Sequence, residues 1–155
     1  MTARPKRIDL LGVATASGAS VRGCGMGPEA LRVAGLIEAL IDLDHMVADH
    51  GDLRRPQPEI STNPSSGRLP DERKSDVLSL AQRVSDAGLG ILDEGHFPVF
   101  IGGDHSIAMG TVSAVVRHCL PAGRPVHVLW IDAHADYNTP DTSPSGNLHG
   151  MPLAL

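Results

Sequence analysis

Apolar residues gather in short runs along this chain, and the spacing of these runs predicts strands alternating with helices. The run over 8–14 predicts a first strand and a shorter run over 45–48 predicts a second. The runs over 97–101 and 126–131 each predict a further, buried strand. Strands that alternate with helices are typical of a mostly parallel sheet covered on both faces. The pattern therefore predicts an α/β fold.

Two helices are predicted between the first three strands. A glycine-rich turn leads to Pro28 and Glu29, which are both favourable in the first turn of a helix, and apolar residues keep helical spacing as far as Ile41. A second helix begins near 70–72 and carries one apolar face. Gly88 and Gly90 are expected to weaken this helix, and Gly95 to end it.

The remaining segments complete a single predicted domain. Residues 53–69 are rich in Pro, Ser, Asn and Gly and predict an irregular surface loop. Residues 106–118 predict a further helix. Residues 151–155 are typical of the opening of another helix, which nothing caps. We therefore expect residues 1–155 to be the N-terminal portion of one longer domain.

Composition narrows the class of partner. The 155 residues include 41% hydrophobic side chains, enough for one core, and carry a formal net charge of −5. This charge argues against nucleic acid or an anionic membrane as the main partner. No stretch approaches the ~20 apolar residues of a membrane helix, and Asp9 interrupts the apolar stretch that a secretory signal would need. A cytoplasmic protein is expected.

Two polar blocks directly follow the third and fourth predicted strands. They read Gly-Gly-Asp-His-Ser over 102–106 and Asp-Ala-His-Ala-Asp over 132–136. Open α/β sheets bind their ligands at the carboxyl ends of parallel strands. Two imidazoles with at least two carboxylates, and no thiolate, favour a catalytic divalent cation over structural zinc.

Each block also has a purely structural interpretation. The glycine pair could form an ordinary tight turn with Asp104 or Ser106 as the N-cap of the next helix, which would leave His105 an incidental polar residue. Trp130 and Tyr137 are expected to be packing residues. Surface or packing positions are likewise expected for the other histidines that lack such neighbours: His45, His50, His96, His118 and His127.

The alternation within the second block favours the metal interpretation. On an extended backbone, Asp132, His134 and Asp136 would project to the same side. Ionisable groups crowded in this way would repel one another or stay unpaired without a cation. With His105 at the end of a neighbouring strand, the four residues predict a metal site.

A polar loop continues from the second block as far as Gly150. Its Asn, Asp, Ser, Pro and Gly residues all favour turns, which is the structural alternative. The same loop places amides and hydroxyls beside the predicted metal, where they suit the carboxylate and amino groups of a zwitterionic substrate. His149 could carry protons near neutral pH.

From residue 8 onward the chain resembles the arginases of the ureohydrolase family. The resemblance rests on a Gly-Val, Arg-Gly and Gly-Pro pattern over 12–28, Gly-Asp-Leu over 51–53, the two polar blocks, and Ser-Gly-Asn-Leu-His-Gly over 145–150. It implies a truncated three-layer α-β-α fold of the arginase/deacetylase type. It also implies two Mn²⁺ ions and hydrolysis of L-arginine to L-ornithine and urea by a metal-activated hydroxide.

The resemblance assigns roles to matching positions. His105, Asp132 and Asp136 would bind one manganese ion, and Asp132 and His134 the other. Such a pair of cations lowers the pKa of a bridging water, and the resulting hydroxide would attack the guanidinium carbon. The positions that match the remaining site residues are Asn138, Ser145 and Asn147 for the amino-acid end of the substrate and His149 for proton transfer.

The family pattern also extends beyond this chain. Its second half holds a Ser-x-Asp-x-Asp-x-x-Asp-Pro segment with two more metal ligands, which is absent from these 155 residues. A lone chain is therefore expected to be an incomplete, inactive fragment, with a homo-oligomer as a possible assembly. Two alternatives stay open: a ureohydrolase acting on agmatine or another guanidino compound, and a noncatalytic remnant that binds metal weakly or pairs with an arginase subunit.

Overall fold

A parallel sheet of three strands forms the centre of the computed structural model, which describes residues 5–21, 23–53 and 71–155. The strands are β1 (Arg7–Val13), β2 (Met46–Asp52) and β3 (Phe97–Gly102), in the order β2-β1-β3. Both ladders are parallel. The first three predicted strands are thus confirmed. The predicted loop over 53–69 lies almost wholly outside the described residues.

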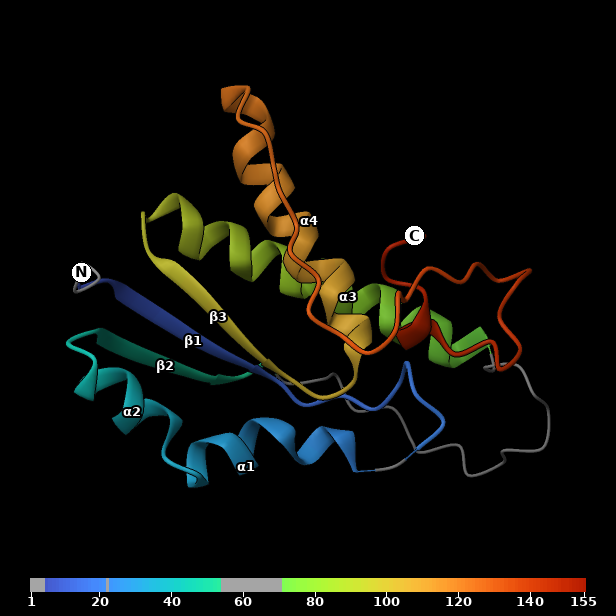
Figure 1. Ribbon diagram of the computed structural model, residues 1–155, viewed down its shortest axis with the longest axis horizontal. Helices are drawn as coiled ribbons and strands as arrows, with labels where there is room; N and C mark the ends of the chain where they lie inside the picture. Colours follow the sequence, from blue (N-terminus) through green and yellow to red (C-terminus); the bar gives the residue numbers. More distant parts are fainter. Residues whose placement is uncertain (1–4, 22, 54–70) are drawn as a thin grey trace.

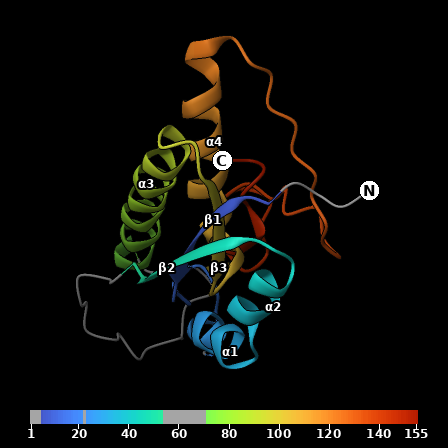
Figure 2. The same cartoon turned by 90° about the vertical axis from the view of Figure 1, so that its left-hand side faces the viewer.

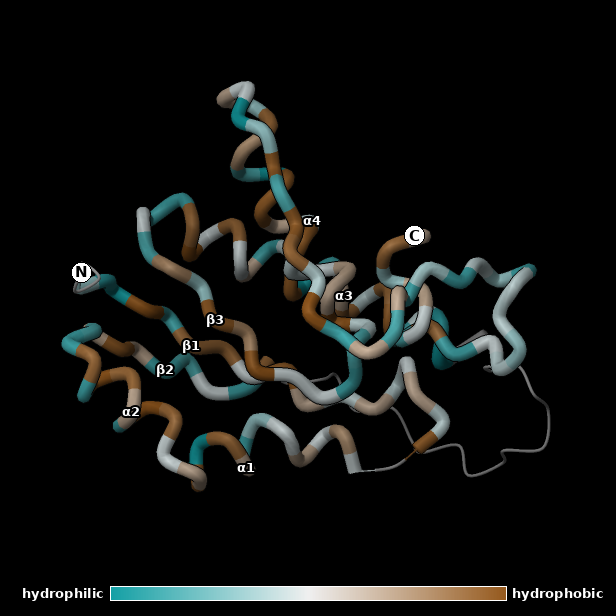
Figure 3. Tube along the Cα trace, viewed as in Figure 1, coloured by the Kyte–Doolittle hydropathy of each residue, from teal (hydrophilic) through white to brown (hydrophobic). Residues whose placement is uncertain are grey.

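Helices cover both faces of this sheet, so the predicted three-layer fold is confirmed (Figures 1 and 2). On one face lie α1 (Gly27–Val33) and α2 (Leu36–Asp42), and on the other lies α3 (Asp71–Asp93), against which α4 (Ala108–Cys119) packs. Val13 of β1 is fully buried and clusters with Leu80 and Val84 of α3. The apolar positions of the strands, brown in Figure 3, therefore lie between the helical layers. None of the described helices is both long and apolar enough to span a membrane.

The helix predicted to run from Pro28 to Ile41 is two helices. Gly35 separates α1 from α2 and has a φ of 87°, a left-handed conformation that costs glycine little. The apolar spacing continues through the break, which is why the sequence pattern suggested one helix. Apolar periodicity does not detect a single left-handed residue.

Within α3, Gly88 has a packing role. A Cβ at this position would lie 2.7 Å from Cζ of Phe100 and 2.8 Å from Cβ of Ala114. The glycine therefore allows α3 to approach β3 and α4 closely, so its cost in helix propensity is offset by packing. Gly95, with a φ of 78°, follows the end of α3 as predicted.

The fourth predicted strand is wrong. Residues 126–131 form no ladder with any described strand, and the segment arches away from α4 in Figure 2. Leu129 and Ile131 are 84% and 87% exposed. An apolar run can form a buried strand only beside a partner strand and under a covering layer, and this run has neither among the described residues. The helix expected to open at 151–155 is a turn instead.

Candidate metal and substrate site

The turn after β3 is built around close backbone contact. Gly103 N–H donates to the carbonyl of Val13 at 3.0 Å, and Asp104 N–H donates to the carbonyl of Thr15 at 3.0 Å. A Cβ on Gly103 would lie 1.9 Å from the Thr15 oxygen, so no side chain fits there. The glycine therefore lets the chain leave β3 directly beside the end of β1, which positions His105 at this edge of the sheet.

Asp104 fixes the turn that carries His105. Its side chain is the N-cap of the 3₁₀ turn His105–Ile107, where Oδ1 accepts from Ser106 N–H at 3.0 Å. Its other oxygen, Oδ2, accepts from Gly18 N–H at 2.8 Å. Asp104 therefore has the capping role that the structural interpretation of this block allowed for Asp104 or Ser106. In addition, the same carboxylate ties the loop after β1 to the site.

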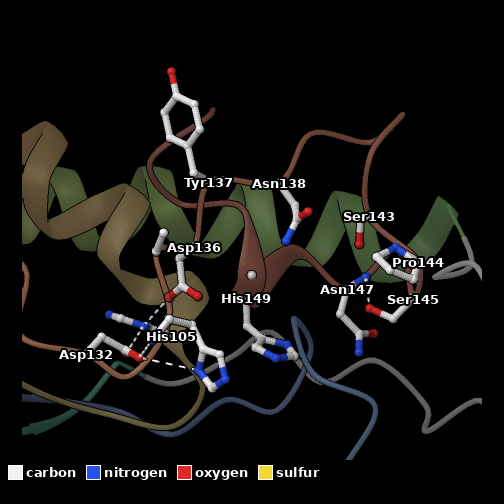
Figure 4. A pocket seen from close by; sticks show the side chains of 13 residues that line it. His105, Asp132, Asp136, Tyr137, Asn138, Ser143, Pro144, Ser145, Asn147 and His149 are labelled. Carbon is white, nitrogen blue, oxygen red and sulfur yellow. Dashed lines mark hydrogen bonds and ion pairs between the residues drawn. The ribbon is translucent and has the colours of Figure 1, made fainter.

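Three of the four predicted ligands come together at this edge. His105 Nδ1 lies 2.6 Å from Asp136 Oδ2 and 3.1 Å from Asp132 Oδ2 (Figure 4). One ligand atom from each of the three residues lies within 4.8 Å of the others. One imidazole nitrogen and two carboxylate oxygens at this spacing fit a divalent cation.

The local electrostatics favour the ionised form of Asp132. The backbone N–H of His134 donates to Asp132 Oδ1 at 2.8 Å, and this hydrogen bond lowers the pKa of the Asp132 carboxyl, with smaller contributions from the charges of His105 and His134. An ionised carboxylate is the form that a metal ion requires.

His134 lies outside this group of three. Its side chain is 82% exposed and its Nδ1 lies 3.6 Å from Asp132 Oδ1. The extended alternation predicted for 132–136 does not hold, because the segment bends and Asp136 adopts a φ of 47° in the left-handed region. The bend buries the Asp136 carboxylate beside His105 and leaves the His134 imidazole in solvent.

A pocket of about 640 Å³ joins the three clustered residues to the polar loop. His149 Nδ1 lies 2.9 Å from the carbonyl of Gly18, and Asn147 Oδ1 accepts from the hydroxyl of Ser20 at 2.7 Å. The loop after β1 thus contacts two of the residues that line the pocket. Every predicted site residue lines it: His105, Asp132, His134, Asp136, Asn138, Ser145, Asn147 and His149.

Sequence reasoning missed two supports of this pocket. Trp130, expected to be a packing residue, stacks on the His105 imidazole with ring centroids 4.6 Å apart and planes 22° from parallel. Its place two residues before Asp132 was the available signal. The second support is the loop at Gly18 and Ser20, for which the sequence offered no chemical signal. Tyr137 lines the pocket but points away from His105 (Figure 4).

The fold and the pocket together define an α/β protein with a candidate metal and small-molecule site at the carboxyl ends of parallel strands. The Arginase family model matches residues 6–155. The chain therefore belongs to the arginase family.

Individual relatives agree with this assignment. The chain is 41% identical over 149 residues to the arginase of Bacillus caldovelox, covering 96% of this chain and 48% of that protein. The crystal structure of that arginase matches with a TM-score of 0.82 at 39% identity, over 96% of this chain and 48% of the other. The arginase of Entamoeba histolytica in complex with L-ornithine matches with a TM-score of 0.84 at 30% identity, over 99% and 50%. The chain spans about half the length of the relatives it matches.

Proposed function

We propose that this chain carries the N-terminal half of an arginase active site, which hydrolyses L-arginine to L-ornithine and urea. The observation that supports this function is the division of one pocket into two chemical ends. His105, Asp132 and Asp136 form an acidic, imidazole-bearing end. The polar loop lines the other end with amides and hydroxyls. Divalent cations that activate water for attack on a guanidinium suit the first end, and a zwitterionic amino-acid group suits the second.

The acidic end fits manganese as the cofactor of the whole enzyme. His105, Asp132 and Asp136 would hold one Mn²⁺, and His134 would join Asp132 at a second ion. The exposed His134 side chain has room to turn, and its Nδ1 is already 3.6 Å from Asp132 Oδ1. A bound pair of divalent cations lowers the pKa of a water molecule, which makes it a nucleophile near neutral pH.

The polar loop would select an amino acid over its decarboxylated amine. Asn138 and Ser145 can each donate a hydrogen bond to an α-carboxylate, which arginine has and agmatine lacks. Asn147 is oriented by its hydrogen bond from Ser20. Asn138 and Ser145 are exposed here, and if the bound substrate buries them, a site of this kind can reject analogues without the carboxylate by several powers of ten. His149, held at the carbonyl of Gly18, would carry protons during product release.

The test joins this chain to the second half of the Bacillus caldovelox arginase and measures urea release. We expect Mn²⁺-dependent turnover with a strong preference for L-arginine over agmatine. Asn138→Ala and Ser145→Ala should lower kcat/KM for L-arginine, whereas Asp132→Ala or His134→Ala should abolish turnover through metal loss.

Asp141→Ala is the matched control, because Asp141 is an exposed residue of the same loop that does not line the pocket. This variant should keep the parent kcat/KM. Comparable rates on agmatine would instead indicate a different ureohydrolase. A folded hybrid that binds Mn²⁺ without any turnover would favour a noncatalytic role for this chain.

A further inference from the structure

A second cluster of metal-ligating side chains lies away from the pocket. Asp9 is on β1, His50 is on β2, and His96 directly precedes β3. Asp9 pairs in register with Ala48 of β2 and Pro98 of β3, so the cluster lies toward the amino-terminal ends of β1 and β3. The candidate active site lies at the opposite, carboxyl-terminal edge. The fold thus brings Asp9 close to His50, which lies 41 positions further along the chain, and to His96, which lies 46 positions beyond His50.

The three side chains meet at one carboxylate oxygen. Asp9 Oδ2 lies 2.8 Å from Nε2 of His50 and 3.4 Å from Nδ1 of His96. The same His96 Nδ1 lies 3.3 Å from Glu94 Oε2. One ligand atom each from Asp9, Glu94 and His96 lies within 4.8 Å of the others, and His50 is outside this group.

Asp9 is a buried carboxylate with an incomplete set of partners. Its side chain is 2% exposed on the central strand of the sheet. Within the described residues, its Oδ1 and the Nδ1 of His96 are buried without a hydrogen-bond partner. The nearest cation to Oδ1 is Nε of Arg7 at 3.6 Å, on a side chain that is half exposed. Buried charges of this kind are costly unless they are paired or coordinate a metal.

The Asp9 carboxyl is held in the ionised form. Burial acts to raise the pKa of the Asp9 carboxyl, but the hydrogen bond with His50 and the charges of both histidines together hold it below its usual value. The carboxylate is therefore ionised at neutral pH, as a metal ligand must be.

We propose that Asp9, Glu94 and His96 form a second metal site, selective for a zinc-like transition-metal ion, with the half-exposed His50 turning in from Asp9 as the fourth ligand. Zn–N and Zn–O bonds of ~2.0–2.1 Å in a tetrahedron place ligand atoms roughly 3.3 Å apart. His96 Nδ1 lies 3.4 Å from Asp9 Oδ2 and 3.3 Å from Glu94 Oε2, close to this spacing, and His50, 2.8 Å from Asp9 Oδ2, would move to complete the tetrahedron. Two imidazoles also favour zinc over manganese, because a given nitrogen and oxygen site binds Mn²⁺ more weakly.

Such an ion would link the three strands of the sheet. Asp9 is on the central strand, His50 on β2, and His96 at the start of β3. Because an ion that binds only the folded state stabilises it by mass action, occupancy should raise the melting temperature. The site is thus structural, and it is separate from the proposed hydrolysis.

The experiment uses the whole 155-residue chain carrying His105→Ala and Asp132→Ala, which disables the candidate active site. Zn²⁺ is titrated by calorimetry, and Co²⁺ is added as an absorbance probe of tetrahedral coordination. We expect one Zn²⁺ per chain and a tetrahedral Co²⁺ spectrum. In this background, His50→Gln and His96→Gln should each weaken Zn²⁺ binding at least tenfold and remove the rise in melting temperature.

His118→Gln is the matched control, because His118 on α4 also pairs with a carboxylate, but with Asp93, at 2.7 Å, and not with Asp9. This variant should bind Zn²⁺ like its parent. The proposal is overturned if the background chain binds no Zn²⁺, or if binding survives both glutamine substitutions. Should a variant fail to fold, NMR of the otherwise unsubstituted background chain decides the question: Zn²⁺ must shift the imidazole signals of His50 and His96, and unshifted signals refute the site.

Discussion

Replacing Asp104 tests whether one buried carboxylate organises the candidate active site. Asp104 is 5% exposed and accepts hydrogen bonds from Gly18 N–H at 2.8 Å and Ser106 N–H at 3.0 Å. A hydrogen bond to a charged group contributes ~1.5–3 kcal/mol, and an unsatisfied buried donor costs ~1–3 kcal/mol. In Asp104→Asn, one oxygen still accepts a bond, but the new NH₂ group faces the other N–H donor.

We therefore expect Asp104→Asn to lower the free energy of unfolding by about 2 kcal/mol. Asp104→Ala, which leaves both N–H groups without the side-chain acceptor, should lower it by about 4 kcal/mol. Urea denaturation followed by circular dichroism measures both values at constant pH. Asp141→Asn, at an exposed loop position, is the control and should stay within ~0.5 kcal/mol of the parent.

The same substitutions should also weaken metal binding. His105 directly follows Asp104, and the loop at Gly18 contacts His149, so a loosened cap disturbs both ends of the pocket. Calorimetry with Mn²⁺ should therefore show weaker binding for Asp104→Asn than for the parent. If both substitutions left the unfolding free energy and the Mn²⁺ affinity within error of the parent, the positioning role of Asp104 would be refuted.

Three further predictions concern the metal, the exposed segment and acid stability. The chain alone should bind Mn²⁺ weakly, and His105→Ala should abolish this binding. Tight binding of two Mn²⁺ ions per chain in calorimetry would contradict the view that the chain holds only part of the metal site. Lysines at Leu129 and Ile131, which are 84% and 87% exposed, should reduce self-association in light scattering; unchanged scattering would implicate another surface. Hydrogen bonds from Arg32 lower the pKa of Asp49 in the folded protein. The stabilisation that these bonds provide should therefore be complete above the pKa of Asp49 in the unfolded chain, ~4, and should disappear as the pH falls through its lower pKa in the folded protein. In urea melts, Arg32→Gln should cost about 1–2 kcal/mol at pH 6 and less at pH 3; an equal cost at both would exclude this ion pair.

The sequence alone predicted the layered fold and residues that line the pocket. Alternating apolar runs predicted β1, β2 and β3 with helices between them, because buried strands and amphipathic helices leave a local periodic pattern. The first polar block marked pocket-lining residues because it follows β3, whereas the second lines the pocket although the strand predicted before it does not form. Parallel strands bring their carboxyl ends to one edge, so the ends of distant strands can be expected to meet.

Tertiary structure decided what depends on contacts between distant segments. The left-handed Asp136 turns its carboxylate toward His105 and leaves His134 outside the group, although the sequence shows three evenly spaced ligands. The apolar run over 126–131 remains exposed because a strand needs a partner, and periodicity does not show whether one is present. Asp9 and His50 lie 41 residues apart, and only the register of β1 with β2 brings them to 2.8 Å. Local patterns indicate which face of a strand or helix is apolar. Strand pairing and the assembly of metal ligands depend instead on where the rest of the chain folds.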